Sequence, residues 1–416
     1  MEEPWLPLQP SFHEVFQPYT NNVQDVRTFF GSNIQHHRDN YEYGFINNAS
    51  MIEDINTVMG GLSLSYNNNN RRETGSTNHT YIDNHPSMMM RELVLSMAMD
   101  WRGCQYLQAK IEKGNPADVE FILSIVKDHV HQLMTHNNNY LIKKIFQARS
   151  GVTPEQMESI VLSIISDDQK LKHVCMDNRG TRVMQNMLKN IKLSFTTYNV
   201  VVCTMHRITL ALVKSFNGGY VILQCLKFFQ SEHKRVILDQ VARNCVDITT
   251  DKIGCSIIQK CLSLVEGSVK SLLVTEIISN AMILAEDPYG NYVLQFVITM
   301  ESSATREKMI KQLRGKFARF SMSKHSSNVV EDLLRFSNEN DVAVIVEEIM
   351  KSCDFLNVVQ DPFGNYVAQR ALKCTKGRLH RELAKLITSN KRILQSHLYG
   401  KRVLTMAMTE RSRFGV

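Results

Sequence analysis

A nine-residue pattern recurs along the chain and constrains its fold more than any other feature. The pattern has a capping residue, two variable residues, a small residue, two chemically distinctive residues, two apolar residues and a polar one. Clear copies span Asp100–Gln108, Asp177–Gln185, Asp251–Gln259, Asp287–Gln295 and Asp361–Gln369, looser copies begin at Thr135, Ser215 and Ser323, and a partial ninth begins at His397. Their small residues lie 35 to 42 residues apart, which indicates a protein built from repeats.

Each copy has the character of a helix start. Eight of the nine starting residues are Asp, Ser or Thr, whose side chains cap helices by accepting backbone N–H bonds, and Pro288 and Pro362 suit a first helical turn. On the helix that follows, the apolar pair faces the protein interior. The first distinctive residue and the final polar residue, such as Asn291 and Gln295, are four positions apart and share the opposite face. We call these two residues the clasp and expect each repeat to display one.

Other amphipathic stretches lie between the copies, at residues 119–134, 156–165, 233–245 and 341–351. Each repeat therefore contains at least two helices, and stacked repeats predict an all-α solenoid with one continuous core and one concave ladder of helices. Such a stack is one cooperative unit, so residues 86–416 are predicted to be a single domain. The longest spacing, 42 residues, implies an insertion around residues 150–152.

The N-terminal region has a different composition. Residues 1–90 contain 4 Arg, no Lys and 10 Asp or Glu, a charge of −6, together with 13 Asn, whereas the rest of the chain carries +13. Because its few apolar residues show no sustained period, we expect residues 1–85 to be a disordered, Asn-rich acidic region. It would serve either as a regulatory or partner-binding tail or as a spacer under little constraint. The basic excess in the remainder suits a polyanionic partner.

The clasps and the residue between them carry groups suited to nucleic-acid bases. In repeats one to eight they are, in order, Cys104, Gln105 and Gln108; Asn139, Tyr140 and Lys143; Thr181, Arg182 and Gln185; Gly219, Tyr220 and Leu223; Cys255, Ser256 and Gln259; Asn291, Tyr292 and Gln295; Ser327, Asn328 and Glu331; and Asn365, Tyr366 and Gln369. Asn with Gln offers the donor and acceptor that a uracil edge needs, and the acceptor-only Glu331 suits the two adjacent N–H donors of guanine. A small residue beside Gln leaves room for a purine. Tyr and Arg offer faces for base stacking.

These residues resemble those of the Pumilio (PUF) family of RNA-binding proteins, whose helical repeats each read one base. The match runs from near Met88 to the end of the chain and is carried by Asp287–Gln295, Asp361–Gln369 and, between them, Ser327–Glu331. The resemblance implies a right-handed, curved solenoid of eight repeats with a partial C-terminal capping repeat and a concave face that binds single-stranded RNA. It also implies a cytoplasmic monomer that binds the 3′ untranslated regions of messenger RNAs and regulates their translation and stability. Repression or decay factors would bind the convex face.

The resemblance predicts a target close to 5′-UGUANAUA, with the RNA antiparallel to the protein. Repeats eight, seven and six would read U, G and U, and repeats five, three and one would favour A. The earlier repeats depart from the family pattern. Lys143 cannot accept a hydrogen bond, repeat four has no polar clasp at Gly219 and Leu223, and Gln105 and Ser256 are poor stacking surfaces. Repeat two would read U weakly, and repeat four would accept any base.

Other functional classes have less support. A HEAT- or armadillo-like scaffold that binds proteins shares the period and the buried pairs, and a divergent relative could bind structured or ribosomal RNA. The chain has no Walker loop, no GxGxxG or GxSxG motif and no His/Cys ligand spacing, so we expect neither an enzyme nor a cofactor or metal. We also expect no secretion signal and no membrane segment. The nine cysteines are expected to be free thiols, with Cys104 and Cys255 displayed and Cys203, Cys245 and Cys353 in the core.

Overall fold

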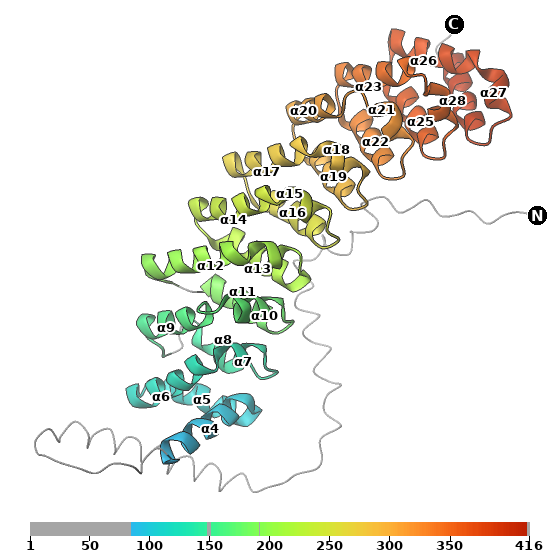
Figure 1. The fold of residues 1–416 in the computed structure, drawn as a ribbon. Helices are drawn as coiled ribbons and strands as arrows, with labels where there is room; N and C mark the ends of the chain where they lie inside the picture. Colours follow the sequence, from blue (N-terminus) through green and yellow to red (C-terminus); the bar gives the residue numbers. More distant parts are fainter. Residues whose placement is uncertain (1–84, 148–150, 191, 414–416) are drawn as a thin grey trace, which may run out of the picture. The chain divides into compact units, whose positions relative to one another are not determined.

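The computed structural model describes residues 85–147, 151–190 and 192–413, all within one compact unit, His79–Val416 (Figure 1). These residues form helices joined by short turns and contain no strand. The region predicted to be disordered, residues 1–85, lies outside the described residues except for His85, where the first described helix begins. None of these helices is both long enough and apolar enough to span a membrane.

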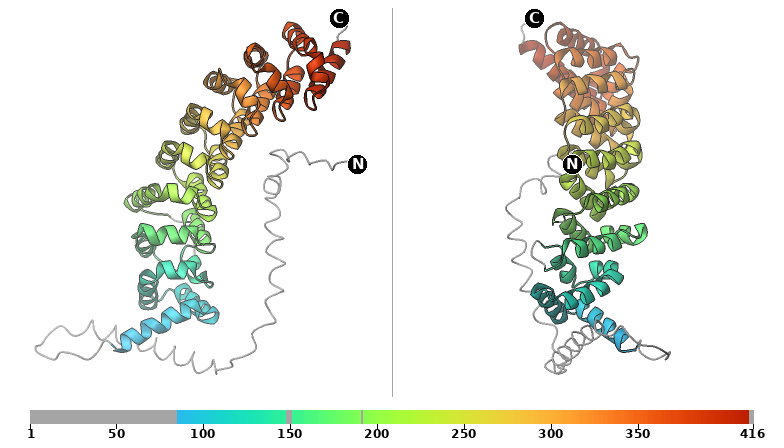
Figure 2. Two further views of the ribbon diagram at one scale, coloured as in Figure 1. Left: turned by 45° about the vertical axis from the view of Figure 1, so that its right-hand side comes forward. Right: turned by 90° about the vertical axis from the view of Figure 1, so that its left-hand side faces the viewer.

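The helices fall into three sets that alternate along the chain. The first set, the motif helices, starts within the repeated sequence pattern. It comprises α5 (Trp101–Lys113), α8 (Tyr140–Ile145), α11 (Gly180–Asn190), α13 (Phe216–Phe228), α16 (Gly254–Leu264), α19 (Gly290–Met300), α22 (Ser326–Phe336), α25 (Gly364–Cys374) and α28 (Gly400–Arg413). Consecutive motif helices pack side by side, and Figure 2 shows them along the inner side of the bend within this unit.

The second set, the outer helices, follows the motif helices; α6 packs against α9, and the members from α14 to α26 pack one against the next, with the long helix α12 (Phe195–Val213) against α14. It comprises α6 (Pro116–Asp128), α9 (Pro154–Ile164), α14 (Ser231–Arg243), α17 (Gly267–Ser279), α20 (Ser303–Leu313), α23 (Glu339–Lys351) and α26 (Gly377–Ser389). The amphipathic stretches predicted at 156–165, 233–245 and 341–351 are confirmed as helices of this row. The stretch at 119–134 is instead broken at His129, whose backbone leaves helical geometry between α6 and the next helix.

The third set, the short helices, was not separated by the sequence pattern. It precedes the motif helices and comprises α7 (Val130–Thr135), α10 (Asp168–Met176), α15 (Cys245–Thr249), α18 (Ala281–Glu286), α21 (Phe317–Ser321), α24 (Phe355–Gln360) and α27 (Lys391–Gln395). In repeats one and four its place is taken by the ends of two longer helices, α4 (His85–Met99) and α12 (Phe195–Val213). Most repeats therefore contain three helical segments, where the sequence predicted at least two.

The apolar pairs of the motif helices form a continuous core, as predicted. The exposed fraction is 2% or less for Leu141 and Ile142, Val183 and Met184, Val221 and Ile222, Ile257 and Ile258, Val293 and Leu294, and Val329 and Val330. Burying one such side chain stabilises the fold by about 1.5–3 kcal/mol. Because each motif helix places its pair between neighbouring helices, this stabilisation depends on the stacking of repeats.

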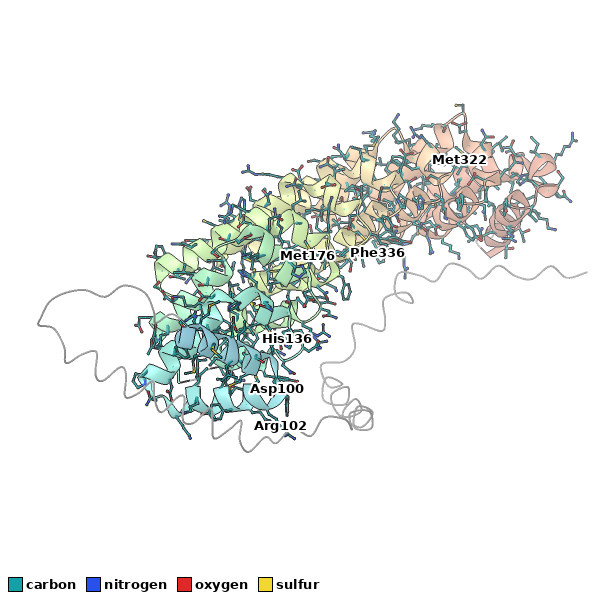
Figure 3. All side chains as sticks on the ribbon, turned by 60° about the horizontal axis from the view of Figure 1, so that its bottom comes forward. Asp100, Arg102, His136, Met176, Met322 and Phe336 are labelled. Atoms are coloured by element: carbon teal, nitrogen blue, oxygen red, sulfur yellow. The ribbon has the colours of Figure 1, made fainter. Side chains whose placement is uncertain are left out.

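Two asparagines tie neighbouring repeats together, Asn138 in the turn before α8 and Asn217 in the first turn of α13. Nδ2 of Asn138 donates a hydrogen bond of 2.7 Å to the carbonyl oxygen of the last residue of α4, in the preceding repeat. Nδ2 of Asn217 likewise donates to the carbonyl of Met176, which ends α10, at 2.9 Å. Figure 3 shows Asp100, His136 and Met176, which lie close to the starts of three successive motif helices, along one edge of the stack.

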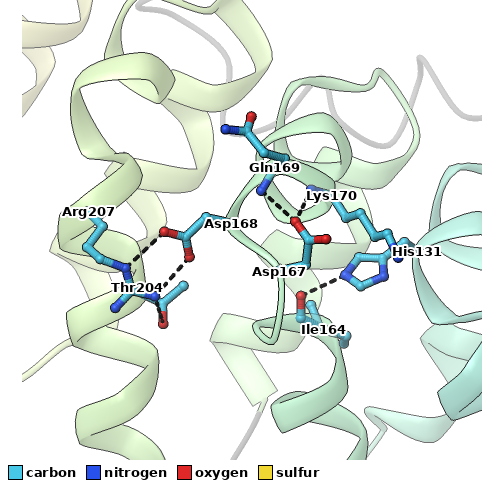
Figure 4. Close-up of polar contacts among 8 residues, drawn as sticks. All are labelled: His131, Ile164, Asp167, Asp168, Gln169, Lys170, Thr204 and Arg207. Carbon is cyan, nitrogen blue, oxygen red and sulfur yellow. Dashed lines mark hydrogen bonds and ion pairs between the residues drawn. The ribbon is translucent and has the colours of Figure 1, made fainter.

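Polar side chains also join short helices to other helices, away from the motif helices (Figure 4). Asp168 of α10 accepts two hydrogen bonds, of 2.9 and 2.8 Å, from the Arg207 guanidinium on α12, and these bonds lower the pKa of Asp168. Nε2 of His131 on α7 lies 2.8 Å from the carbonyl oxygen of Ile164 on α9. The side chains of Arg207 and Asp168 are 53% and 35% exposed, so the Arg207–Asp168 ion pair contributes at most about 1 kcal/mol.

Candidate nucleic-acid interface

The residue that starts each sequence motif positions the motif helix. The side chains of Asp100, Asp177, Asp251, Asp287 and Asp361 each accept hydrogen bonds from the backbone N–H groups two and three residues later, at 2.7 to 2.9 Å. Ser215 accepts one such bond from the N–H three residues later. The predicted caps are therefore confirmed in these repeats.

The predicted cap of repeat two is wrong. The Thr135 hydroxyl donates back to two carbonyls of α7 and is not available to the motif helix. Nδ1 of His136 replaces it and accepts the backbone N–H two residues later at 3.2 Å. His397, the one starting residue outside the Asp, Ser and Thr set, caps α28 by accepting from the backbone N–H three residues later at 3.3 Å. At Ser323 the described residues show no such bond.

Close packing explains the small residue in the motif. A Cβ atom on Gly254 would lie 2.2 Å from the carbonyl oxygen of Ile248, at the preceding short helix. Repeat seven has Ser326 at this position, and its hydroxyl donates to the corresponding carbonyl, that of Phe320, at 3.0 Å. The small residue thus lets the motif helix approach the short helix, and this approach determines where the clasp lies.

In four repeats the two clasp residues are joined by a hydrogen bond. Nε2 of the glutamine donates in Gln108–Cys104 (Sγ, 3.2 Å), Gln185–Thr181 (Oγ1, 3.1 Å), Gln295–Asn291 (Oδ1, 2.8 Å) and Gln369–Asn365 (Oδ1, 3.0 Å). In the last two pairs the asparagine NH2 group donates to main-chain oxygens at the start of the motif, which turns Oδ1 toward the glutamine. Each glutamine keeps Oε1 and one N–H for a ligand, the acceptor and donor that a uracil edge requires.

The first clasp residue is buried, so the prediction that both clasp residues are displayed is wrong. The exposed fraction is 0% for Asn365, 1% for Asn291 and Cys104, 3% for Asn139, 4% for Thr181 and Ser327, and 7% for Cys255. The physical reason is that this residue follows the small residue directly and lies where neighbouring helices pack closely. The second clasp residues are half-buried, and the residues between are more open, with Tyr140, Tyr292 and Tyr366 exposed by 45%, 37% and 39%.

All nine cysteines are free, as predicted, but their placement was only partly anticipated. Cys245 is in the core, whereas Cys203 and Cys353 are exposed. Cys104 and Cys255 are buried because they occupy first clasp positions, and burial raises the pKa of Cys255 to about 11. No group of three or more His, Cys, Asp or Glu side chains in the described part of the chain is arranged to hold a metal ion.

Repeat two has an aromatic cluster in place of a joined clasp. Nζ of Lys143 lies 5.1 Å from the ring centroid of Tyr140, and the exposed Trp101 ring meets Tyr140 edge-on at 5.3 Å. Nδ2 of Asn139 donates to the carbonyl of Met134, so the clasp residues make separate contacts. Trp101 was missed by the sequence reasoning, although an aromatic residue directly after the cap was visible in the pattern.

Repeat four combines a similar cluster with a missing clasp. Phe216, exposed and again directly after the cap, meets Tyr220 edge-on at 5.3 Å, and Nζ of Lys260 lies 4.9 Å from the Tyr220 ring centroid. A Cβ atom on Gly219 would lie 2.4 Å from Cδ1 of Ile257 in repeat five. Gly219 is therefore a packing position, which agrees with the sequence prediction that this repeat has no polar reader.

Repeat seven places its clasp carboxylate in a charged cluster. Nε of Arg370, on α25 of the next repeat, lies 3.6 Å from Oε2 of Glu331. Burial raises the pKa of Glu331, and Arg370 opposes this shift. Burial, with a further contribution from Glu331, raises the pKa of the neighbouring Asp332 to about 6. Sequence reasoning identified Glu331 but missed Arg370, which directly follows the clasp residue Gln369.

The repeated fold and the clasps define a class of protein, the helical-repeat RNA-binding proteins. A model of the Pumilio-family RNA binding repeat matches residues 94–126, 171–193, 217–242, 244–278, 280–314, 316–350 and 354–386. The chain belongs to the Pumilio family. The matched segments include neither α8 nor α28, the motif helices of repeat two and of the partial ninth copy, so the count of eight repeats stays a prediction.

Two relatives from Arabidopsis thaliana illustrate the similarity. "Putative pumilio homolog 7, chloroplastic" is 31% identical over 407 residues, covering 96% of this chain and 61% of that protein. "Pumilio homolog 12" is 33% identical over 316 residues, covering 76% and 52%. The chain thus spans between about half and two thirds of the length of these curated relatives.

Solved structures share the fold. "Puf4 RNA binding domain bound to HO endonuclease RNA 3' UTR recognition sequence" has a TM-score of 0.59 and 27% identity, covering 75% of this chain and 97% of that one. "Crystal structure of the RNA-binding domain of yeast Puf5p bound to AAT2 RNA" has a TM-score of 0.63 at 22% identity and covers 78% and 98%. The second shows the fold alone. The family match replaces the HEAT or armadillo alternative.

Proposed function

We propose that residues 86–416 bind single-stranded RNA in a sequence-specific manner along the motif helices, with repeats eight, seven and six reading 5′-UGU. The observation that carries this proposal is the order of the clasps. Two hydrogen-bonded Asn–Gln pairs, Asn291–Gln295 and Asn365–Gln369, stand on either side of Glu331. Each pair offers a donor and an acceptor to uracil, and the carboxylate between them offers acceptors to the two guanine donors.

Base stacking would supply part of the affinity that does not depend on sequence. Tyr292 and Tyr366 are exposed between the clasps, and Arg182 and Asn328 are exposed at the corresponding positions of repeats three and seven. Stacking on an aromatic side chain such as Tyr292 or Tyr366 contributes about 1–3 kcal/mol per base. In repeats two and four a lysine already lies over the tyrosine ring, which agrees with weaker base choice there. The full target is therefore close to 5′-UGUANAUA, with the fourth repeat indifferent.

The cellular role rests on the family. The Puf4 structure is described as bound to a 3′ UTR recognition sequence, and by similarity this chain regulates the translation and stability of messenger RNAs through such elements. It would act as a monomer in the cytoplasm, by binding and not by catalysis, with repression or decay factors on the convex face. Because one relative's name includes the word chloroplastic, fractionation of cells that express the full chain is the test of compartment.

Selection of RNA from a random pool by the full chain tests the function. We expect an enriched UGU, because the three intact readers are consecutive. A Gln295→Ala, Gln369→Ala variant should lose selection for both uracils, whereas Gln312→Ala on the outer helix α20 should select the wild-type consensus. A consensus without UGU would overturn the proposal, and a flat profile with retained binding would favour structured RNA.

A further inference from the structure

Arg370 crosses from repeat eight to the clasp of repeat seven. It lies on α25, which packs against α22, and its Nε approaches Oε2 of Glu331 to 3.6 Å. Both side chains are partly buried, with exposed fractions of 33% and 25%. Nε of Arg370 is itself buried and has no hydrogen-bond partner among the described residues. A separation of 3.6 Å is longer than a hydrogen bond, so the two groups form a charge pair that leaves the carboxylate oxygens able to accept bonds from a ligand.

The residue after the second clasp residue reaches back in other repeats too. Lys144 forms an ion pair with Glu112, and Nζ of Lys260 lies 3.5 Å from the hydroxyl of Tyr220. These partners belong to the preceding motif helix but are not clasp residues. In the Arg370 pair the side chain reached is the base-reading group itself.

The charge state of Glu331 depends on its neighbours. Burial raises the pKa of this carboxyl, and Arg370 and then Lys373, both on α25, lower it. Asp332 and Arg335 lie close by on α22, and Cys374 faces the cluster from α25. A protonated carboxyl has one O–H donor in place of an acceptor and cannot accept from both guanine donors. A neighbour that favours the charged form of Glu331 therefore supports guanine selection in repeat seven.

We propose that Arg370 is a positioning residue for guanine selection: it keeps the Glu331 carboxylate ionised and oriented so that both oxygens accept from the base. This inference rests on the proposed function, because it assumes that Glu331 reads guanine. It means that the base preference of repeat seven depends on a side chain of repeat eight, outside the clasp of either repeat.

The test compares affinities of the full chain for RNAs that carry UGU, UUU or UAU in the same context. Variants Arg370→Gln and Arg370→Lys are made with Asp332→Asn, so that the neighbouring carboxyl does not titrate. Arg335→Gln in the same background is the matched control, because Arg335 lies in the same cluster but is exposed and contacts the Phe336 ring. Affinities are measured at pH 8 and pH 6, and thermal melting confirms folding of each variant.

We expect Arg370→Gln to reduce discrimination between UGU and UUU about tenfold, the scale of one hydrogen bond to a charged group. The loss should be larger at pH 6, because without Arg370 the pKa of Glu331 rises and more of the carboxyl is protonated. Arg370→Lys and Arg335→Gln should keep the base preference of the parent protein, Asp332→Asn, at both pH values. The loss should be confined to the guanine-containing RNA.

Three outcomes would overturn the inference in distinguishable ways. A parent protein without UGU preference removes the proposed function and the inference together. A parent preference that Arg370→Gln retains at both pH values overturns the inference alone. An equal loss of affinity for all three RNAs shows that Arg370 has a structural role only. If Arg370→Gln does not fold, Arg370→Lys becomes the test: a folded Arg370→Lys variant that loses guanine selection overturns the positioning role.

Discussion

Nε2 of Gln295 donates a hydrogen bond of 2.8 Å to Oδ1 of Asn291, one turn earlier on the same helix. Because the asparagine amide is held by two main-chain carbonyls, this bond orients the glutamine before any ligand arrives. A side chain that is already oriented loses less conformational entropy on binding. The same arrangement recurs at Gln369 and Asn365, so repeats six and eight present pre-oriented glutamines of the same kind.

Replacing Ser327 with Asn and Glu331 with Gln should convert repeat seven from a guanine reader into a uracil reader. The new pair reproduces the clasps of repeats six and eight. A two-point base contact is worth about 1–3 kcal/mol in the comparable DNA case, so affinity for UGU should fall roughly ten- to hundredfold while affinity for UUU rises. Binding titrations with both RNAs check this. Retained preference for guanine would mean that Glu331 does not read a base.

A side chain at Gly219 should destabilise the interface between repeats four and five. Gly219→Ala places a Cβ atom 2.4 Å from Cδ1 of Ile257, and overpacking of this kind costs about 1–3 kcal/mol of unfolding free energy. Ile257→Val removes that Cδ1 atom. In a double-mutant cycle measured by denaturant unfolding, the combined variant should lose less stability than the two single variants added together. Strict additivity would show that the contact is not strained.

Asp332→Asn should stabilise the protein at neutral pH. Burial raises the pKa of Asp332 to about 6, above its unfolded value near 3.8, so folding favours the protonated form. The stability that this group contributes is present below pH 3.8 and is lost as the pH rises through 6. As the pH rises from 4 to 7, the free energy of unfolding of the variant should therefore increase relative to that of the wild type by about 1–3 kcal/mol. Melting curves of both proteins at pH 4 and pH 7 provide the measurement. A stability difference between variant and wild type that is the same at both pH values would contradict the prediction.

Deletion of residues 1–84 should leave RNA preference intact, because all proposed readers lie after this region. A modest gain in affinity is expected, since the deleted residues carry a net charge of −6 that repels an RNA backbone. Competition between UGU and UUU RNAs, with circular dichroism as the control for folding, is the measurement. Loss of UGU preference in a folded protein would assign part of the recognition to the deleted region.

RNA affinity should fall as salt rises, because basic side chains that approach phosphates release counterions. The described region carries the basic excess of the chain, so the effect should survive deletion of residues 1–84. Titrations between about 50 and 200 mM salt give the slope, and in this range several phosphate contacts change affinity by orders of magnitude. A flat dependence would point to a protein-binding groove.

The sequence predicted the stack and the positions of the clasps because both follow from period and helix face. Val293 and Leu294 are buried where the pattern placed them, and Asp287 caps its helix as expected. Burial of Asn291 could not be derived from helix geometry alone, because it depends on how closely the neighbouring helices approach. The cap by His136 lies outside the usual capping preferences, and the Arg370–Glu331 pair depends on the lateral distance between two repeats.

Packing between neighbouring repeats also determines how the stack responds to a destabilising change at one interface. In the part of the chain that the structure describes, α22 packs against α19 on one side and α25 on the other, and the other motif helices continue this row. Two distant repeats are therefore connected only through all the interfaces that lie between them. An RNA strand bound across several motif helices, as proposed, would connect these helices a second time, independently of those interfaces. A substitution that strains one interface, such as Gly219→Ala against Ile257, should then weaken the free protein more than the complex.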